Sequence, residues 1–231
     1  MIFNQFFDPV SSTFTYLISS GEGREALIID PVIEKTHEYI LYLKKLDLKL
    51  VKVIDTHIHA DHISGMKELN KQTNCAKIMG DKSPSEVITI RVKDNEKIKI
   101  ENIELTSMYT PGHTDCSYSF FMNDRIFTGD TLLINGTGRT DFQNGNPIEQ
   151  YHSLFDQILK LPEKTFVYPA HDYKGNKVST IGEEKKNNPR LKVNSPDQYA
   201  ELMNNLIPDN PKMMDIAIIA NIKGKTLNQI N

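Results

Sequence analysis

The segment His57-Ile58-His59-Ala60-Asp61-His62 places three imidazoles and one carboxylate within six consecutive residues. It follows VKVID (51–55), an apolar β-branched run that is typical of a buried strand. Two imidazoles on one extended turn can face one metal position, and the acid and imidazole that follow can face a neighbouring one. Isolated histidines are commonly ordinary surface or core residues, which is our interpretation of His37 and His152. The clustered histidines instead predict a metal-binding loop.

Three further candidate ligands follow the ends of later strand-like runs. They are His113 after residues 103–110, Asp130 after 125–129 and His171 after 165–170. Loops at the carboxyl ends of strands are where α/β proteins usually place their sites. Imidazole and carboxylate suit zinc and non-haem iron, whereas magnesium and calcium prefer oxygen ligands alone. The arrangement therefore predicts a metalloenzyme.

Composition favours an ordinary globular protein without a nucleic-acid or membrane partner. Of 231 residues, 39% are hydrophobic, and the interspersed charges sum to −3. The apolar start MIFNQFFDPV has no basic flank and is interrupted by Asp8-Pro9, so we expect a first strand rather than a signal peptide. No run approaches the length of a membrane span, and we expect a cytoplasmic protein. Cys75 and Cys116 could pair, but buried free thiols are expected.

Periodicity predicts alternating strands and helices in one compact domain, residues 1–231. Strands are expected at 14–18, 26–30, 51–55, 97–100, 103–109, 118–122, 125–128, 165–170 and 216–219. Helices are expected at 34–46, from a cap at Asp61 through Leu69, from Pro147 onward and at 196–206. Asn123-Asp124 is typical of a hairpin turn. This order favours a layered α/β/β/α sandwich with ligands at the strand ends.

The pattern HxHxDH followed by a distant His, Asp and His resembles the metallo-β-lactamase-fold superfamily over essentially the whole chain. The resemblance implies an α/β fold, a four-layer αββα sandwich of two similar halves with the metal site at one edge of the sheets. It also implies that the segment from about residue 182 to 231 packs on this domain and contributes to the substrate site. That superfamily includes thioester hydrolases, lactamases, nucleases and oxygen-using iron enzymes, so the fold alone does not select a reaction.

Four segments look like the ETHE1-like persulfide dioxygenase family, also called sulfur dioxygenases. They are TPGHTDC (110–116), FTGDTLLINGTGRTDFQNG (127–145), YPAHDYKG (168–175) and EEKKNNPRL (183–191). GRTDFQ and AHDY discriminate best, because the related glyoxalase II pattern differs at residues 140–142 and at Asp172. One departure from the dioxygenase pattern is Thr137, where many members have cysteine.

The dioxygenase resemblance implies one Fe(II) per chain, held by His57, His113 and Asp130. Such a 2-His-1-carboxylate triad leaves open positions for a substrate sulfur and for O₂. The other four candidates would surround the ligands and orient them: His59, Asp61, His62 and His171. The implied reaction converts glutathione persulfide, O₂ and water into glutathione and sulfite. The resemblance also makes a homodimer an expectation.

Two alternatives stay open on the sequence. The chain retains every ligand of a dinuclear zinc or mixed-metal site, as in glyoxalase II. In that interpretation Asp130 bridges two metals and an activated hydroxide cleaves a hydroxyacylglutathione thioester. A metal- or persulfide-sensing binding protein is less favoured, because neither a DNA-binding module nor a reactive cysteine pair is evident.

Candidate substrate contacts come from residues near the family-like segments. Only five of the 27 basic residues are arginines, and Arg139 and Arg190 lie inside those segments, where planar donors could hold the carboxylates of glutathione. Arg139 could equally brace its loop by pairing with Asp141 or Asp172, which leaves Arg190 as the better candidate. Three further candidates have structural alternatives such as packing, capping or support of a ligand: Tyr173, Asn221, whose position is associated with glutathione binding in the family, and Thr114.

Overall fold

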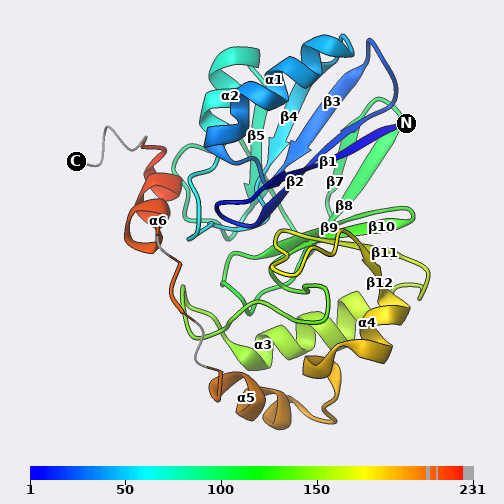
Figure 1. Cartoon of the computed structure of the whole chain (residues 1–231), viewed down its shortest axis with the longest axis vertical. Coiled ribbons are helices and arrows are strands. Elements are labelled where there is room, and N and C mark those ends of the chain that lie inside the picture. The colour runs from blue at the N-terminus through cyan, green and yellow to red at the C-terminus, as the bar shows by residue number, and fades with distance from the viewer. Residues whose placement is uncertain (207–208, 212, 226–231) are drawn as a thin grey trace.

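In the computed structural model, which describes residues 1–206, 209–211 and 213–225, two six-stranded sheets lie face to face (Figure 1). The first has the order β1-β2-β3-β4-β5-β6. Its strands are β1 (Ile2–Asp8), β2 (Thr13–Ser19), β3 (Glu25–Ile29), β4 (Lys49–Ile54), β5 (Ala76–Gly80) and β6 (Ile90–Val92). The first three are antiparallel, and β3 to β6 run parallel.

The second sheet has the order β12-β11-β10-β9-β8-β7. Its strands are β7 (Lys97–Ile100), β8 (Ile103–Tyr109), β9 (Tyr118–Met122), β10 (Arg125–Gly129), β11 (Phe166–Pro169) and β12 (Ser179–Thr180). Because β9 is antiparallel to both β8 and β10, and β11 is parallel to β10, the strands β8, β10 and β11 run in one direction. Their carboxyl ends therefore meet at one edge of the sheet.

Helices cover the outer faces of both sheets. On the first sheet lie α1 (Thr36–Lys45), preceded by the short turn η1 (Ile33–Lys35), and α2 (Met66–Thr73). On the second lie α3 (Pro147–His152), η2 (Ser153–Gln157), η3 (Ile158–Lys160), α4 (Ile181–Asn187), η4 (Pro189–Leu191) and α5 (Pro196–Asn204). The last helix, α6 (Met214–Lys223), returns to the first half of the molecule, where Ile218 and Ile222 pack against the core (Figure 1).

Three apolar cores hold these layers together. The first lies between the sheets and contains fully buried aromatic side chains such as Tyr16, Phe120 and Phe127. The second fills the space between the first sheet and α1, α2 and α6. The third fills the space between the second sheet and α3 to α5. The cores alternate with the layers, as expected when each sheet buries both faces, and the predicted αββα order is confirmed.

Two element predictions are wrong. Residues 216–219 lie inside the helix α6, not in a strand. A short apolar run does not distinguish the two, and here the helix ends at Gly224, whose φ of +61° provides a left-handed C-cap. Asp61 does not cap a helix, because α2 begins only at Met66, whose N–H donates to the Ser64 hydroxyl. Parts of the predicted C-terminal segment, 207–208, 212 and 226–231, lie outside the described residues.

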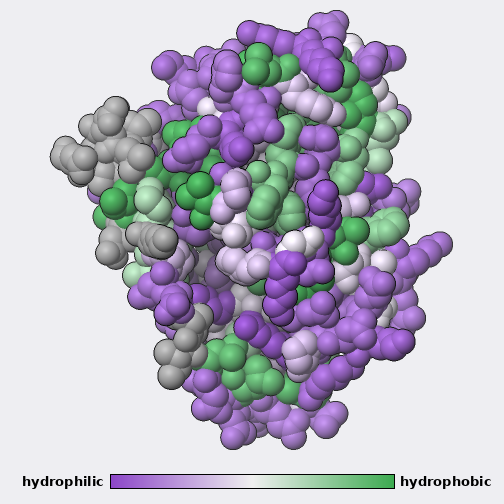
Figure 2. Space-filling model, in the orientation of Figure 1, coloured by the Kyte–Doolittle hydropathy of each residue, from purple (hydrophilic) through white to green (hydrophobic). Residues whose placement is uncertain are grey.

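The predictions about the two cysteines and the hairpin turn agree with the fold. Cys75 and Cys116 are buried free thiols. Asn123 has a φ of +42° in the predicted hairpin turn between β9 and β10. None of the helices in the described residues is both long and apolar enough to cross a membrane. Figure 2 shows a mostly hydrophilic face on which hydrophobic side chains form small separate groups.

A buried tyrosine joins the two sheets by a hydrogen bond. The Tyr16 hydroxyl on β2 donates to the Pro169 carbonyl on β11 at 2.5 Å, and only 1% of Tyr16 is exposed. We predict that Tyr16→Phe lowers the free energy of unfolding by about 1–3 kcal/mol, because the buried carbonyl loses its partner. Urea unfolding followed by circular dichroism measures this change. A stability within about 0.5 kcal/mol of the parent would contradict the prediction.

Candidate metal centre

The candidate ligands lie on loops that leave the carboxyl ends of four strands. The segment 57–62 follows β4 of the first sheet, and His113, Asp130 and His171 follow β8, β10 and β11 of the second. Because those last three strands run in one direction, their loops reach the same edge of the sandwich. The side chains of His57, His113 and His171 are buried there. Segments distant in sequence thus converge as the sequence predicted.

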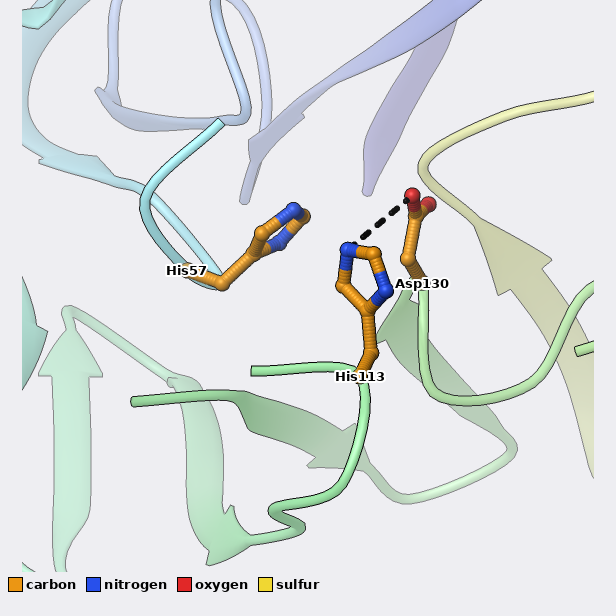
Figure 3. A group of neighbouring side chains, drawn as sticks. All are labelled: His57, His113 and Asp130. Atoms are coloured by element: carbon orange, nitrogen blue, oxygen red, sulfur yellow. Dashed lines mark ion pairs between the residues drawn. The ribbon is translucent and has the colours of Figure 1, made fainter. Parts of the chain in front are cut away.

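His57, His113 and Asp130 form a candidate metal-binding triad (Figure 3). One donor atom from each lies within 4.8 Å of the others, and His113 Nε2 is 3.6 Å from Asp130 Oδ2. The rings of His57 and His113 are nearly perpendicular, with centroids 4.9 Å apart. Two nitrogens and one carboxylate oxygen therefore converge on a single point from three different loops.

The orientation of His113 is set by a backbone carbonyl. Its Nδ1 lies 2.8 Å from the Arg139 carbonyl, which can only accept, so Nδ1 carries the proton and Nε2 has a free lone pair. Gly138 permits this approach, because a Cβ there would lie 2.3 Å from the Asp130 carbonyl and 2.7 Å from His113 Nδ1. The GTGR segment therefore places the donor nitrogen of His113 toward Asp130.

His57 is oriented by a hydrogen-bonded chain that begins at the buried carboxylate of Asp30. The Thr56 N–H and hydroxyl both donate to Asp30, at 2.7 and 3.0 Å. Because the single hydroxyl proton is used there, the Thr56 oxygen accepts from His57 Nδ1 at 3.0 Å. This leaves the Nε2 lone pair of His57 free. Burial, together with the neighbouring imidazoles of His59 and His113, lowers the pKa of His57 well below its usual value, which keeps it neutral.

His171 bridges two carboxylates. Its Nδ1 lies 2.6 Å from Asp130 Oδ1, and its Nε2 lies 2.8 Å from Asp61 Oδ2. Burial disfavours the charged ring, but the two carboxylates outweigh that effect and raise the pKa of His171 well above its usual value. Burial likewise opposes ionisation of Asp130, yet His171, His113 and His57 lower its pKa below the usual value. Asp130 is therefore an anion held in place by His171.

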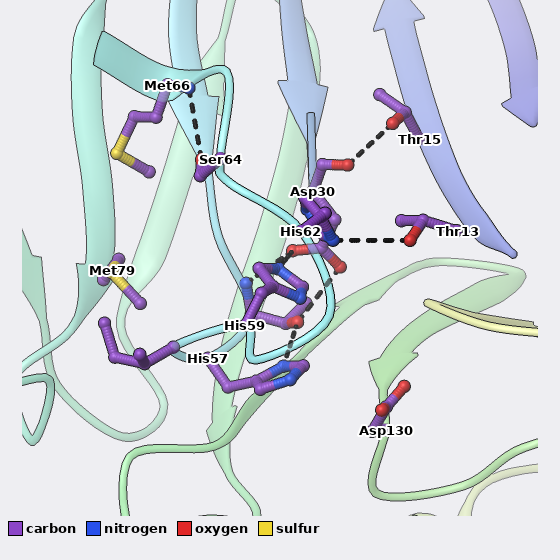
Figure 4. Close-up of polar contacts among 12 residues, drawn as sticks. Thr13, Thr15, Asp30, His57, His59, His62, Ser64, Met66, Met79 and Asp130 are labelled. Atoms are coloured by element: carbon purple, nitrogen blue, oxygen red, sulfur yellow. Dashed lines mark hydrogen bonds and ion pairs between the residues drawn. The ribbon is translucent and has the colours of Figure 1, made fainter. Parts of the chain in front are cut away.

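A second candidate group lies beside the first. Donor atoms of His59, Asp61 and His62 lie within 4.8 Å of one another. His59 Nε2 is 3.1 Å from the Asp30 carboxylate (Figure 4), and His62 Nδ1 is 2.9 Å from Asp61. Among the described residues, the buried His59 Nδ1 and His62 Nε2 have no hydrogen-bond partner. Two imidazole nitrogens in this group are therefore available to a ligand.

A cavity of about 540 Å³ opens over the triad. His57, His113 and Asp130 line it together with Asp61 and His171. Its remaining walls include the β1–β2 loop, the 138–143 loop and a C-terminal segment, contributed by Val10, Ser11, Ser12, Leu133, Gly138, Arg139, Phe142, Gln143, Tyr173, Asp209, Asn210, Pro211 and Met213. The cavity is large enough for a small organic substrate.

Comparisons with known proteins identify the relatives of this chain. The metallo-β-lactamase superfamily model matches residues 8–94 and 82–171. Persulfide dioxygenase ETHE1, mitochondrial, of Mus musculus is 40% identical over 226 residues, covering 96% of this chain and 88% of the relative. The crystal structure of ETHE1 from Myxococcus xanthus matches with a TM-score of 0.93 and 42% identity, covering 96% of this chain and 98% of that one.

The chain belongs to the persulfide dioxygenase family. A hydroxyacylglutathione hydrolase of Pelagibacter ubique is less similar, at 33% identity over 210 residues that cover 88% of this chain and 85% of the relative. The predicted resemblance and the metallo-β-lactamase fold are thereby confirmed. Membership of this dioxygenase family also makes the chain an enzyme, as the ligand pattern predicted.

Of the five substrate candidates, two line the cavity of this dioxygenase-family chain. Arg139 forms a two-pronged pair with Asp141 at 2.7 and 2.8 Å and donates to the Asp209 carbonyl at 3.1 Å. Two of its five N–H groups remain after these three hydrogen bonds. Tyr173 is 71% exposed, and its ring lies parallel to that of His171, with centroids 6.1 Å apart.

The other three candidates point elsewhere. Arg190 donates to the carbonyl and hydroxyl of Thr137, behind the loop that carries Arg139. The Thr114 hydroxyl contacts Ser117 at 2.7 Å and Cys116 at 3.3 Å. None of Arg190, Thr114 and Asn221 is among the residues that line the cavity above the triad.

The sequence interpretation missed several residues of the site. Asp30 also ends a strand-like run, ALIID, so the signal that identified Asp130 was present there too. The wall formed by Asp209–Pro211 and Met213 had no recognisable signal, because a polar connection between helices does not indicate where the chain passes. Thr13 contacts His171 and Asp61, and its strand position alone does not predict this.

Asn221 holds the metal-binding loop by three hydrogen bonds. Its Oδ1 accepts from the Ser64 N–H at 2.9 Å, and its Nδ2 donates to the carbonyls of His59 and His62 at 2.9 and 3.0 Å. The side chain thus lies in α6 and satisfies backbone groups of a loop about 160 positions earlier in the chain. No strand ends there, contrary to the sequence expectation.

We predict that Asn221→Leu lowers the free energy of unfolding by about 2–3 kcal/mol, because three backbone groups of the loop lose partners. Urea unfolding of the metal-free protein measures the change. The matched substitution Lys223→Leu, at an exposed position of the same helix, is expected to stay within about 0.5 kcal/mol of the parent. Equal stability of the two variants would contradict this role of Asn221.

Proposed function

We propose that this enzyme oxidises the terminal sulfur of glutathione persulfide with O₂, at one Fe(II) ion held by His57, His113 and Asp130. The observation that carries the proposal is the convergence of these three donors at the base of the cavity, in a chain of the persulfide dioxygenase family. In the balanced reaction, glutathione persulfide, O₂ and water give glutathione and sulfurous acid, which ionises to sulfite. The persulfide S–S bond is cleaved, and its outer sulfur is oxidised.

The donor chemistry suits ferrous iron. Both triad imidazoles have their Nδ1 protons engaged by Thr56 and the Arg139 carbonyl, so each offers an Nε2 lone pair. Two neutral nitrogens and one carboxylate form the 2-His-1-carboxylate set typical of non-haem oxygenases. Iron in such a set supplies open coordination positions and the one-electron chemistry that triplet O₂ requires.

The surrounding residues hold the triad ready for the substrate. His171 donates to Asp130 and fixes the direction of its carboxylate. The Asp30–Thr56 chain fixes the ring of His57 in the same way. With one anionic ligand, the centre remains close to neutral when a persulfide anion binds a dication. Positioning and electrostatics are therefore the contribution of the protein chain.

The hydrogen bonding of His171 favours one metal over two, because both of its nitrogens face carboxylates. A second ion held by Asp61, His62 and His171 would need the His171 Nε2 lone pair, but that nitrogen hydrogen-bonds to Asp61. A dinuclear hydroxyacylglutathione hydrolase is the second candidate, because the buried His62 Nε2 and His59 Nδ1 lack partners among the described residues. Such an enzyme would work without O₂.

Substrate recognition is proposed to use the cavity walls. Arg139 has N–H groups to spare at the rim, and a planar cation suits a glutathione carboxylate. Tyr173 presents an exposed ring and hydroxyl beside His171. The segment Asp209–Pro211 completes the wall, in keeping with one domain over residues 1–231 to whose site the C-terminal part contributes. The cytoplasmic location and the homodimer stay predictions from the sequence.

The decisive measurement is O₂ uptake by anaerobically iron-loaded protein when glutathione persulfide is added. We predict uptake, sulfite formation and one iron per chain. Asp130→Ala and His113→Ala should lose iron. Their kcat should fall by more than the roughly 10–100-fold expected when a residue that only supports a ligand is replaced. Full turnover with iron retained in Asp130→Ala would contradict the triad. Cleavage of S-lactoylglutathione without O₂, with two metals bound, would favour the hydrolase instead.

A matched pair of arginine substitutions tests the substrate wall. We predict that Arg139→Gln raises the KM for glutathione persulfide about tenfold with a smaller change in kcat, because a charged hydrogen bond to the substrate is lost. Arg190→Gln is expected to leave KM within about twofold while lowering stability, since Arg190 donates to the carbonyl of Thr137. Steady-state kinetics measure both. An unchanged KM in Arg139→Gln, or a larger rise in Arg190→Gln, would reverse the assignment.

A further inference from the structure

The hydroxyl of Thr13 lies among the three residues that a second metal ion would need. Thr13 begins β2, is fully buried, and its Oγ1 lies 3.1 Å from Asp61 Oδ2 and 3.0 Å from His171 Nε2. The same oxygen is 3.4 Å from His62 Nδ1 (Figure 4). Neither His57 nor His113 is among its hydrogen-bond partners in the described structure. Its contacts therefore belong to the second position, not to the triad.

The backbone holds this hydroxyl in place. Thr13 forms an antiparallel bridge with His171, so the two residues are locked side by side. The Phe14 N–H donates to the Ala170 carbonyl at 2.7 Å, which continues the pairing. Because the single Thr13 proton is donated to Asp61, the Ser11 hydroxyl donates to Thr13 Oγ1 at 2.7 Å, and the Ser11 N–H holds Asp8 Oδ2 at 2.9 Å. The start of β2 is thus attached to the segment that carries His171.

The hydrogen bonds of Asp61 are concentrated on a single oxygen. Its Oδ2 meets the Thr13 hydroxyl, His62 Nδ1 at 2.9 Å and His171 Nε2 at 2.8 Å. That oxygen is saturated, so an ion could approach Asp61 only through the other carboxylate oxygen, Oδ1. His171 offers no lone pair, because both of its nitrogens face carboxylates. The second position is therefore closed at Asp61 Oδ2 and at His171, although His62 Nε2 stays free within the described residues, and a second ion would have to break the hydrogen bond between Asp61 and His171. Thr13 is the contributor to this arrangement that a metal ligand set would not include.

We propose that Thr13 is a positioning residue that keeps this centre mononuclear, by donating to Asp61 and so holding Asp61 and His171 against each other. The proposal rests on the proposed single-metal function and names the residue that makes it single. Loss of the hydroxyl removes one charged hydrogen bond from the closed arrangement. The affinity of the second position for a divalent ion should then rise about tenfold or more.

Metal stoichiometry tests the proposal without reference to activity. Metal-free protein is titrated with Zn²⁺ against a chromophoric chelator, and the metal content is checked by elemental analysis. The parent and Thr13→Ser, which keeps the hydroxyl, are expected to bind one ion tightly. Thr13→Val and Thr13→Ala, which lose it, are expected to bind two. Ser11→Ala serves as a control, because the Ser11 hydroxyl contacts Thr13 and, within the described part of the chain, none of the candidate ligands. This variant should bind one ion.

Each result has a definite meaning. One tight ion in the parent and also in Thr13→Ala and Thr13→Val overturns the role of Thr13 and leaves the single-metal function standing. Two tight ions in the parent overturn the single-metal function itself. Thr13→Ala only removes atoms, so it provides the same test if valine disturbs the packing at the start of β2. A second ion in Thr13→Ser would also contradict the proposal, since that variant retains the hydroxyl.

Discussion

Burial of many ionisable side chains at one edge of the sandwich is the constraint on which the rest of the structure depends. Asp30, Asp61 and Asp130 lie there with five imidazoles, and an unpaired buried charge would be strongly unfavourable. Each carboxylate is therefore matched. Asp30 accepts from Thr56 and His59, Asp61 from two imidazoles and Thr13, and Asp130 from His171. The pairing of Asp30 with Thr56 also fixes which nitrogen of His57 can bind a metal.

Elements far from the site in sequence hold the loops that carry these groups. Asn221 of α6 satisfies the backbone of the metal-binding loop, and Arg190 satisfies the Thr137 carbonyl in the loop that contains Arg139. The Arg139 carbonyl in turn orients His113. The C-terminal helices thus do more than cover the sheet, because both ligand-bearing halves of the site depend on hydrogen bonds from them.

The same ligand list can support one metal or two, and local hydrogen bonding distinguishes the two cases. All the candidate ligands are present, so residue identity does not decide. Contacts among Asp61, His171 and Thr13 engage Asp61 Oδ2 and both nitrogens of His171, which a second ion would otherwise use. In the triad, by contrast, the Nδ1–H groups of His57 and His113 donate to Thr56 and to the Arg139 carbonyl, so each Nε2 keeps its lone pair. In the function proposed for this chain, the hydrogen-bond partners of the candidate ligands therefore matter as much as the ligands themselves.

The sequence by itself determined the sandwich, most of its strands and the candidate ligands at the strand ends, but it did not predict β5, β6 or β12. Those features follow from local patterns: β-branched runs form strands, and His or Asp directly after such a run lies at a sheet edge. Only the tertiary structure decided that 216–219 is helical, that Asn221 and Arg190 contact backbone carbonyls, and that Thr13 lies against His171. These contacts join segments more than 50 residues apart. A local sequence pattern does not indicate which distant group a polar side chain will contact.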